Sequence, residues 1–181
     1  MFFPHQNFNY SWAQGKWYAI AIADAAIKNG AKKKINMHSV FFNATDDHGY
    51  LFTTIMYRPF LPIASSKPIM VNRSHRECDR WIRKFSPTKY PRNFVIEYPC
   101  RPHGLQRYNM IILSTNYNEY ALVGFEQKFH DKEYIHLMLY GRTKTQKSLM
   151  KKRFISFAKK LDFTEDNIIF FIPIEKCIDD S

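Results

Sequence analysis

Polar and apolar side chains alternate along most of this sequence with the period of two that β-strands require. In one such segment Trp81, Arg83 and Phe85 share one face of an extended chain. Short turns with Gly, Asn, Asp or Pro separate eight segments of this kind, which is typical of antiparallel hairpins. They cover residues 16–27, 37–44, 49–57, 77–86, 92–98, 106–115, 119–128 and 133–141. The sequence therefore predicts an all-β fold, an eight-stranded antiparallel up-and-down β-barrel over about residues 16–141 that can hold one small ligand.

A single long segment has helical periodicity instead, from Thr145 to Leu161. Its apolar residues form one stripe and are Leu149, Met150, Phe154, Ile155, Phe157, Ala158 and Leu161. Thr145 is a suitable N-cap residue because its hydroxyl can accept a backbone N–H bond. The pattern predicts one C-terminal α-helix over about 145–161, packed by its stripe against the outside of the barrel.

Residues 59–77 interrupt the alternation and contain Pro59, Pro62 and Pro68. Proline removes donors from a strand ladder, so this segment is predicted to be a long insertion loop at the mouth of the barrel. Its apolar side chains are compatible with a lid over the mouth and equally with a mobile insertion.

A length of 181 residues predicts a single domain that spans residues 1–181. The formal net charge is +11, which attracts anions of any kind. The basic runs Lys32–Lys34 and Lys151–Arg153 are short, however, so solvated faces are the simpler interpretation and no nucleic-acid partner is expected. No run of about 18 apolar residues is present, so no membrane span is predicted.

The three cysteines, Cys78, Cys100 and Cys177, allow one disulfide and one spare thiol. They form no Cys/His grouping of the kind that binds zinc, and no metal site or cofactor is predicted. Three glycosylation sequons begin at Asn9, Asn43 and Asn72. Together with a disulfide, these candidate glycosylation sites indicate a secreted, extracellular protein.

Five motifs add a resemblance to a known family. They are residues 15–18 (Gly-Lys-Trp-Tyr), 78–85, 113–118, 139–144 and 172–180. In this order and spacing they resemble the lipocalins, and within that family they are most similar to the branch that carries bacterial iron-siderophores. The resemblance covers nearly the whole chain and implies a lipocalin calyx, a barrel that is closed at one end and holds its ligand inside.

The resemblance also assigns structural roles. Trp17 is expected to plug the closed end with Arg142 across its ring, and Gly15 lets the chain enter the first strand without a side chain. The family pattern pairs Cys78 with Cys177. Cys100 is then left as a free thiol or as a link to a second copy, so the chain is expected to be a monomer or a Cys100-linked dimer.

In the siderophore-carrying branch three cationic side chains hold a ferric catecholate complex. Arg83 matches the first of them, whereas Gln127 and His136 stand where that branch has lysines. Gln127 is uncharged, and His136 is charged near neutral pH only where its surroundings favour the proton. The resemblance thus implies a cup with less positive charge than the branch it resembles.

Other side chains are expected to line the cup. The aromatic lining falls at Trp81, Tyr108, Phe125 and Tyr140, and the preceding strands place His38, Thr54, Met56 and Arg58 at the cup or its rim. Such a cup is aromatic and mildly cationic, which favours a flat, partly anionic ligand.

The sequence therefore predicts an extracellular carrier of a small molecule in the barrel, with ferric siderophores as a candidate cargo and iron entering only with the siderophore. The alternative is a carrier of a fatty acid, odorant, steroid or retinoid. Catalysis is not expected, because the prostaglandin-isomerising lipocalins use an early cysteine and this chain has none before Cys78. A cell-surface receptor remains open as a protein partner.

Overall fold

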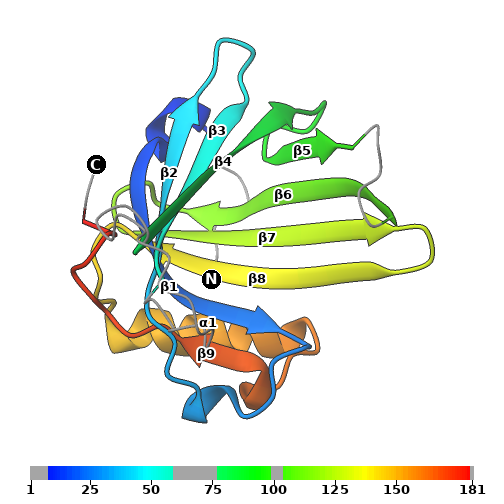
Figure 1. Ribbon diagram of the computed structural model, residues 1–181. Coiled ribbons are helices and arrows are strands. Elements are labelled where there is room, and N and C mark those ends of the chain that lie inside the picture. Colours follow the sequence, from blue (N-terminus) through cyan, green and yellow to red (C-terminus); the bar gives the residue numbers. More distant parts are fainter. Residues whose placement is uncertain (1–7, 59–76, 99–103, 180–181) are drawn as a thin grey trace, which may run out of the picture.

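The protein is described by a computed structural model at residues 8–58, 77–98 and 104–179 (Figure 1). Asn72, Cys100 and residues 59–76 of the predicted loop lie outside this described part. Within it, eight strands form the barrel. They are β1 (Gly15–Asp24), β2 (Ser39–Ala44), β3 (Tyr50–Tyr57), β4 (Cys78–Pro87), β5 (Asn93–Glu97), β6 (Leu105–Thr115), β7 (Tyr120–Phe129) and β8 (Glu133–Gly141).

Antiparallel pairing runs in chain order from β2 to β8, and β1 closes the barrel by pairing with both β8 and β2. The predicted eight-stranded barrel is confirmed. The clearest difference is the first strand, which ends at Asp24 and not at residue 27, because the Asp24 carboxylate accepts a bond from the Ala26 amide in a turn. A ninth strand, β9 (Ile168–Phe170), pairs with β1 beside the barrel and was not predicted from the sequence.

The helix α1 (Ser148–Lys160) lies outside the barrel next to β1 and β9 (Figure 1). Its buried residues Phe154 and Ala158 pack in one cluster with Leu137 and Leu139 of β8, as the apolar stripe predicted. Leu149 and Leu161, at the two ends of that stripe, are exposed instead. The predicted N-cap is wrong. The cap position is Lys147, without a side-chain bond, because the Thr143 hydroxyl holds the Thr145 carbonyl in a turn that precedes the helix.

Three short 3₁₀ helices complete the described elements: η1 (Tyr10–Ala13), η2 (Gly30–Lys32) and η4 (Glu165–Asn167). Among the helices of the described residues, none combines the length and the apolar character that a membrane crossing needs.

The disulfide joins Cys78, the first residue of β4, to Cys177 in the C-terminal tail, with 5.5 Å between the Cα atoms. This pairing confirms the prediction. It closes a loop of 99 positions, which stabilises a protein by about 4–5 kcal/mol when the effect is treated as lost chain entropy. The tail is held further by Asp179, which accepts bonds from the Tyr18 hydroxyl at 2.9 Å and the Lys144 amine at 2.8 Å.

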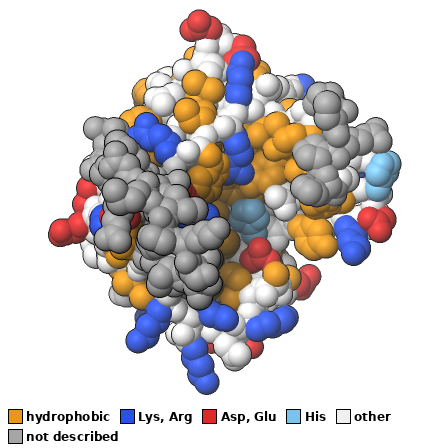
Figure 2. Space-filling view, in the orientation of Figure 1, with side chains coloured by type: hydrophobic (Ala, Val, Ile, Leu, Met, Phe, Trp, Pro, Cys, Tyr) orange, Lys and Arg blue, Asp and Glu red, His pale blue; other side chains and the backbone are white. Residues whose placement is uncertain are grey.

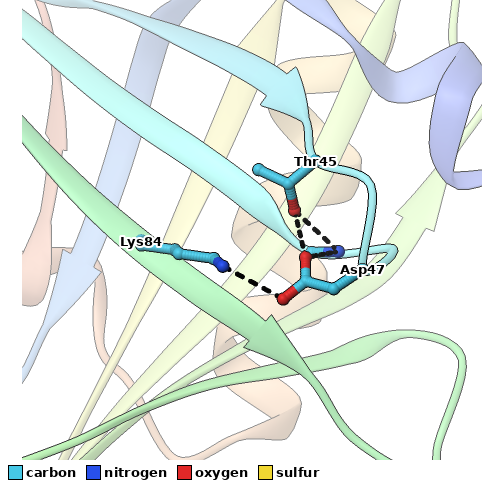
Figure 3. Close-up of polar contacts among 4 residues, drawn as sticks. Thr45, Asp47 and Lys84 are labelled. Carbon is cyan, nitrogen blue, oxygen red and sulfur yellow. Dashed lines mark hydrogen bonds and ion pairs between the residues drawn. The ribbon is translucent and has the colours of Figure 1, made fainter.

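The turn between β2 and β3 is fixed by one carboxylate (Figure 3). Asp47 accepts a bond from the Thr45 hydroxyl and pairs with Lys84 of β4 at 3.0 Å. These two contacts, the Thr45 bond above all, lower the pKa of Asp47 to about 2. Asn43, a candidate glycosylation site, lies exposed near the end of β2 just before this turn.

The closed end of the barrel is built around Trp17, which is fully buried and donates its indole N–H to the Ala13 carbonyl at 2.8 Å. The guanidinium carbon of Arg142 lies 3.7 Å from the centre of the indole, which is the contact that the resemblance implied. Its nitrogens donate to backbone carbonyls of four residues, namely Trp12, Gln14, Lys16 and Tyr117. Gly15 has φ +98°, and a Cβ there would lie 3.2 Å from the guanidinium.

We predict that Arg142→Met lowers the free energy of unfolding by about 3 kcal/mol, because it removes a cation–π contact and leaves several carbonyls without a donor. Urea unfolding followed by circular dichroism measures the change. Arg153→Met, the same substitution at an exposed position of α1, is the control and should change stability by less than about 0.5 kcal/mol. Equal effects of the two substitutions would contradict this role of Arg142.

Candidate functional site

The half of the barrel next to Trp17 is packed with aromatic rings. Phe42 lies 4.9 Å from Phe52 and 6.3 Å from Tyr140, measured between ring centres. Tyr50 and Phe94 lie 4.8 Å apart in the same cluster. Tyr140, predicted to line the cup, is only 2% exposed and is part of this packed floor.

The other half of the barrel is hollowed. Figure 2 shows a recess near the centre of one face, with hydrophobic side chains on its walls and Lys or Arg and His side chains among them. Trp81 is 38% exposed although it lies on the same face of β4 as the buried Phe85. Across the barrel Gln127 and His136, predicted to line the cup, are half-buried.

Arg83 lies on the floor side of the recess between three rings. Its guanidinium carbon is 5.1 Å from the ring centre of Tyr108, 5.3 Å from that of Phe52 and 6.0 Å from that of Phe85. Its Nε atom is buried, and within the described residues it has no hydrogen-bond partner. The barrel thus holds a permanent cation that is surrounded by aromatic faces and retains an unused donor.

The two histidines predicted for the cup do not add charge at neutral pH. His136 stacks on Phe125, with 5.0 Å between the ring centres and 18° between the planes. Its pKa is lowered, mainly by burial. Burial also lowers the pKa of His38 to about 4, and Arg83 contributes to that shift by repelling a second positive charge. Arg83 therefore provides the fixed charge here, and both imidazoles are neutral at pH 7.

Asp24 reaches this end of the barrel through an irregularity that the alternation did not reveal. The register of β1 against β8 shifts between Ala19 and Ala21, and beyond that bulge Asp24 is paired with His136. The carboxylate raises the pKa of His136, partly offsetting the effect of burial. A run of alanine and isoleucine from Ala19 to Ala23 has no polar–apolar contrast, so nothing in the sequence marks the bulge.

The remaining predicted residues divide into wall and rim. Thr54 is buried on the face of β3 that also carries Phe52, and Met56 follows it there, half-buried. The His38 ring lies 5.2 Å from the ring of Phe171. Arg58 lies apart from them, because its side chain is 67% exposed and pairs with Asp79 at 2.7 Å.

No group of three His, Cys, Asp or Glu side chains in the described residues is arranged to hold a metal ion. The recess combines the guanidinium of Arg83, two neutral imidazoles, the Asp24 carboxylate, the Gln127 amide, the Thr54 hydroxyl and aromatic faces. These groups can bind and orient a guest by stacking and hydrogen bonding.

Comparison with known proteins agrees with this geometry. Residues 14–174 match the sequence profile of the lipocalin / cytosolic fatty-acid binding protein family. Human neutrophil gelatinase-associated lipocalin is 35% identical over 174 residues, which is 96% of this chain and 80% of that protein. Dog prostaglandin-H2 D-isomerase is 37% identical over 86 residues, covering 44% of this chain and 42% of that protein.

A solved structure is also similar. The solution NMR structure of lipocalin 12 from rat epididymis superposes with a TM-score of 0.74, covering 93% of this chain and 87% of that chain. Its sequence identity is 21%, so it supports the fold alone.

The lowered pKa of His38 predicts a pH-dependent stability. In the unfolded chain His38 has a pKa near 6.5, whereas in the folded chain its pKa is about 4. Between these two pH values the unfolded chain binds a proton at His38 that the folded chain does not bind, so stability falls as the pH falls from about 6.5 to about 4. His38 accounts for up to about 3 kcal/mol of this loss. Urea unfolding across this range should show a much smaller loss for His38→Gln. Above pH 7 the two stability profiles should run parallel, and an unchanged loss in the variant would contradict the assignment.

Proposed function

Since the chain belongs to the lipocalin family, we propose that it is a secreted carrier that holds a small guest in the recess around Arg83. Small-molecule carriage is the general activity of lipocalins. The disulfide between Cys78 and Cys177 and the candidate glycosylation sites Asn9 and Asn43 support an extracellular location. The observation that best supports this proposal is the position of the Arg83 guanidinium, which lies between aromatic rings and has an Nε–H without a hydrogen-bond partner among the described residues.

The leading candidate guest is a ferric siderophore with catecholate arms. Motifs of the siderophore-carrying branch support it, and so does an arginine among aromatic rings, which suits electron-rich, anionic arms. Iron would arrive as part of the guest and not as a resident cofactor. Gln127 and the neutral His136 contribute no charge at neutral pH, so we expect weaker binding of a trianion than three fixed cations would give.

A largely apolar guest, such as a fatty acid, odorant, steroid or retinoid, is the second candidate. The specific observation in its favour is that both histidines are neutral and that Asp24 lies opposite His136. A cup with one cation and one nearby carboxylate favours a guest with little charge.

We propose that the carrier does no chemistry, although its relatives include prostaglandin-H2 D-isomerases, whose names give them an enzymatic activity. The first cysteine of this chain is Cys78, and both it and Cys177 are consumed by the disulfide. Neither is available as a nucleophile. Cys100 lies outside the described residues, and a Cys100-linked dimer and a cell-surface receptor remain predictions.

Trp81, partly exposed at the recess, is a natural reporter for the guest. Titration with ferric enterobactin should quench the tryptophan fluorescence at micromolar ligand. Arg83→Gln should weaken binding about tenfold or more, because the charged contact is lost. Arg80→Gln is the matched control, since Arg80 is exposed and pairs with Ile55, which packs on the outer side of the barrel.

Absence of quenching by the ferric complex would eliminate the siderophore version. A conjugated fluorescent fatty acid, titrated in the same way, then tests the second candidate. If both guests leave the fluorescence unchanged, the carrier proposal fails for both classes of guest.

A further inference from the structure

Two buried polar atoms on the wall formed by β3 and β4 have no hydrogen-bond partner among the described residues. They are the hydroxyl Oγ1 of Thr54 and the Nε of Arg83. Thr54 is only 4% exposed, so its hydroxyl is also cut off from solvent. A buried polar group without a partner costs free energy, and native structures seldom keep one without a reason.

Strand register places these two groups near one another on the same wall, although they do not bond to each other. Phe52 pairs with Arg83, and Thr54 pairs with Trp81, so Thr54 and Arg83 are diagonal neighbours on the same face of the β3–β4 ladder. Diagonal neighbours are separated by about 7–8 Å at the level of the backbone. The two atoms do not bond to each other, and one acceptor group placed between them would serve both.

The chemistry of the two groups defines what can fill this space. A guanidinium only donates hydrogen bonds, and a threonine hydroxyl can donate one. The missing partner is therefore an acceptor, and the positive charge of Arg83 favours an anionic one. Asp24 repels an anion, but it is paired with His136 on the β1–β8 side of the barrel and not on this wall.

We infer that the β3–β4 wall is the anion subsite of the recess, where Thr54 Oγ1 and Arg83 Nε both donate to an anionic oxygen group of the guest. The inference rests on the proposed function and adds the position and the chemistry of the polar anchor. The oxygens can come from the carboxylate of an otherwise apolar guest or from a catecholate arm of a ferric complex. In both cases the apolar or aromatic body of the guest would extend toward Phe125 and His136.

The test compares a charged guest with its neutral analogue. cis-Parinaric acid, a fluorescent conjugated fatty acid, and its methyl ester are titrated into wild type, Thr54→Val and Thr54→Ser. Thr54→Val should weaken binding of the acid about tenfold and binding of the ester less than twofold. Thr54→Ser, which keeps the hydroxyl, should bind the acid as wild type does.

Thr53→Val is the matched control, because it makes the same change one residue earlier, on the opposite face of β3. It should leave the affinities for both probes within twofold of wild type. The same four proteins are then titrated with ferric enterobactin. A tenfold loss in Thr54→Val for this complex, without binding of the acid, would assign the subsite to catecholate oxygens. Equal losses for acid and ester, or no loss for any charged guest, would overturn the inference.

A second measurement tests the subsite without any guest. Acetate is titrated into ¹⁵N-labelled protein while the Nε–H signal of Arg83, assigned from Arg83→Gln, is followed by NMR. A saturable shift that Thr54→Val reduces supports the subsite. An unchanged signal would overturn it. If wild type binds none of the three guests and yet acetate shifts the signal, the carrier proposal fails for these guests while the anion subsite stands.

Discussion

The first strand carries the constraint on which the rest of the molecule depends. β1 pairs with β2 through Gly15–Tyr18 and with β8 along most of its length, so the sheet becomes a barrel only through this strand. Beyond the pairing with β2, residues Ala21–Ala23 are free to pair with β9 instead. A strand that serves three neighbours must change its direction, and the bulge between Ala19 and Ala21 provides that change. The bulge in β1 thus accounts both for the closure of the barrel and for the position of Asp24 opposite His136.

Charge inside the barrel follows from desolvation. An arginine stays protonated where a histidine does not, because its intrinsic pKa lies far above neutral. The interior accordingly keeps Arg83 charged, surrounds it with ring faces, and holds His38 and His136 neutral. Substituting histidine for lysine in such a site therefore removes charge at neutral pH and does not merely reduce it. The recess is consequently less cationic than the net charge of +11 suggests, because Arg83 is joined there by two neutral imidazoles and the carboxylate of Asp24.

Local patterns in the sequence were sufficient to predict the barrel, the helix and the residues that share a face with Arg83. Alternation requires only that successive side chains point in opposite directions, and this holds wherever a strand is regular. It failed at Ala19–Ala23, where the residues look alike and the strand is bulged. It also missed β9, which has three residues and forms only because β1 offers it an edge. The neutral state of His38 depends on burial and on Arg83, two properties that appear only after strands distant in sequence are brought together.

The two ends of the barrel treat their polar groups in opposite ways. At the closed end the guanidinium of Arg142 covers an indole and donates to four backbone carbonyls. At the recess the guanidinium of Arg83 also lies against rings, but its Nε and the nearby Thr54 hydroxyl lack partners in the described chain. The hydrogen bonds of the guanidinium are thus made at Arg142, whereas the Nε–H of Arg83 is left without an acceptor among the described residues. Folding alone explains the first arrangement, whereas the second acquires a physical reason once a guest supplies the missing acceptor.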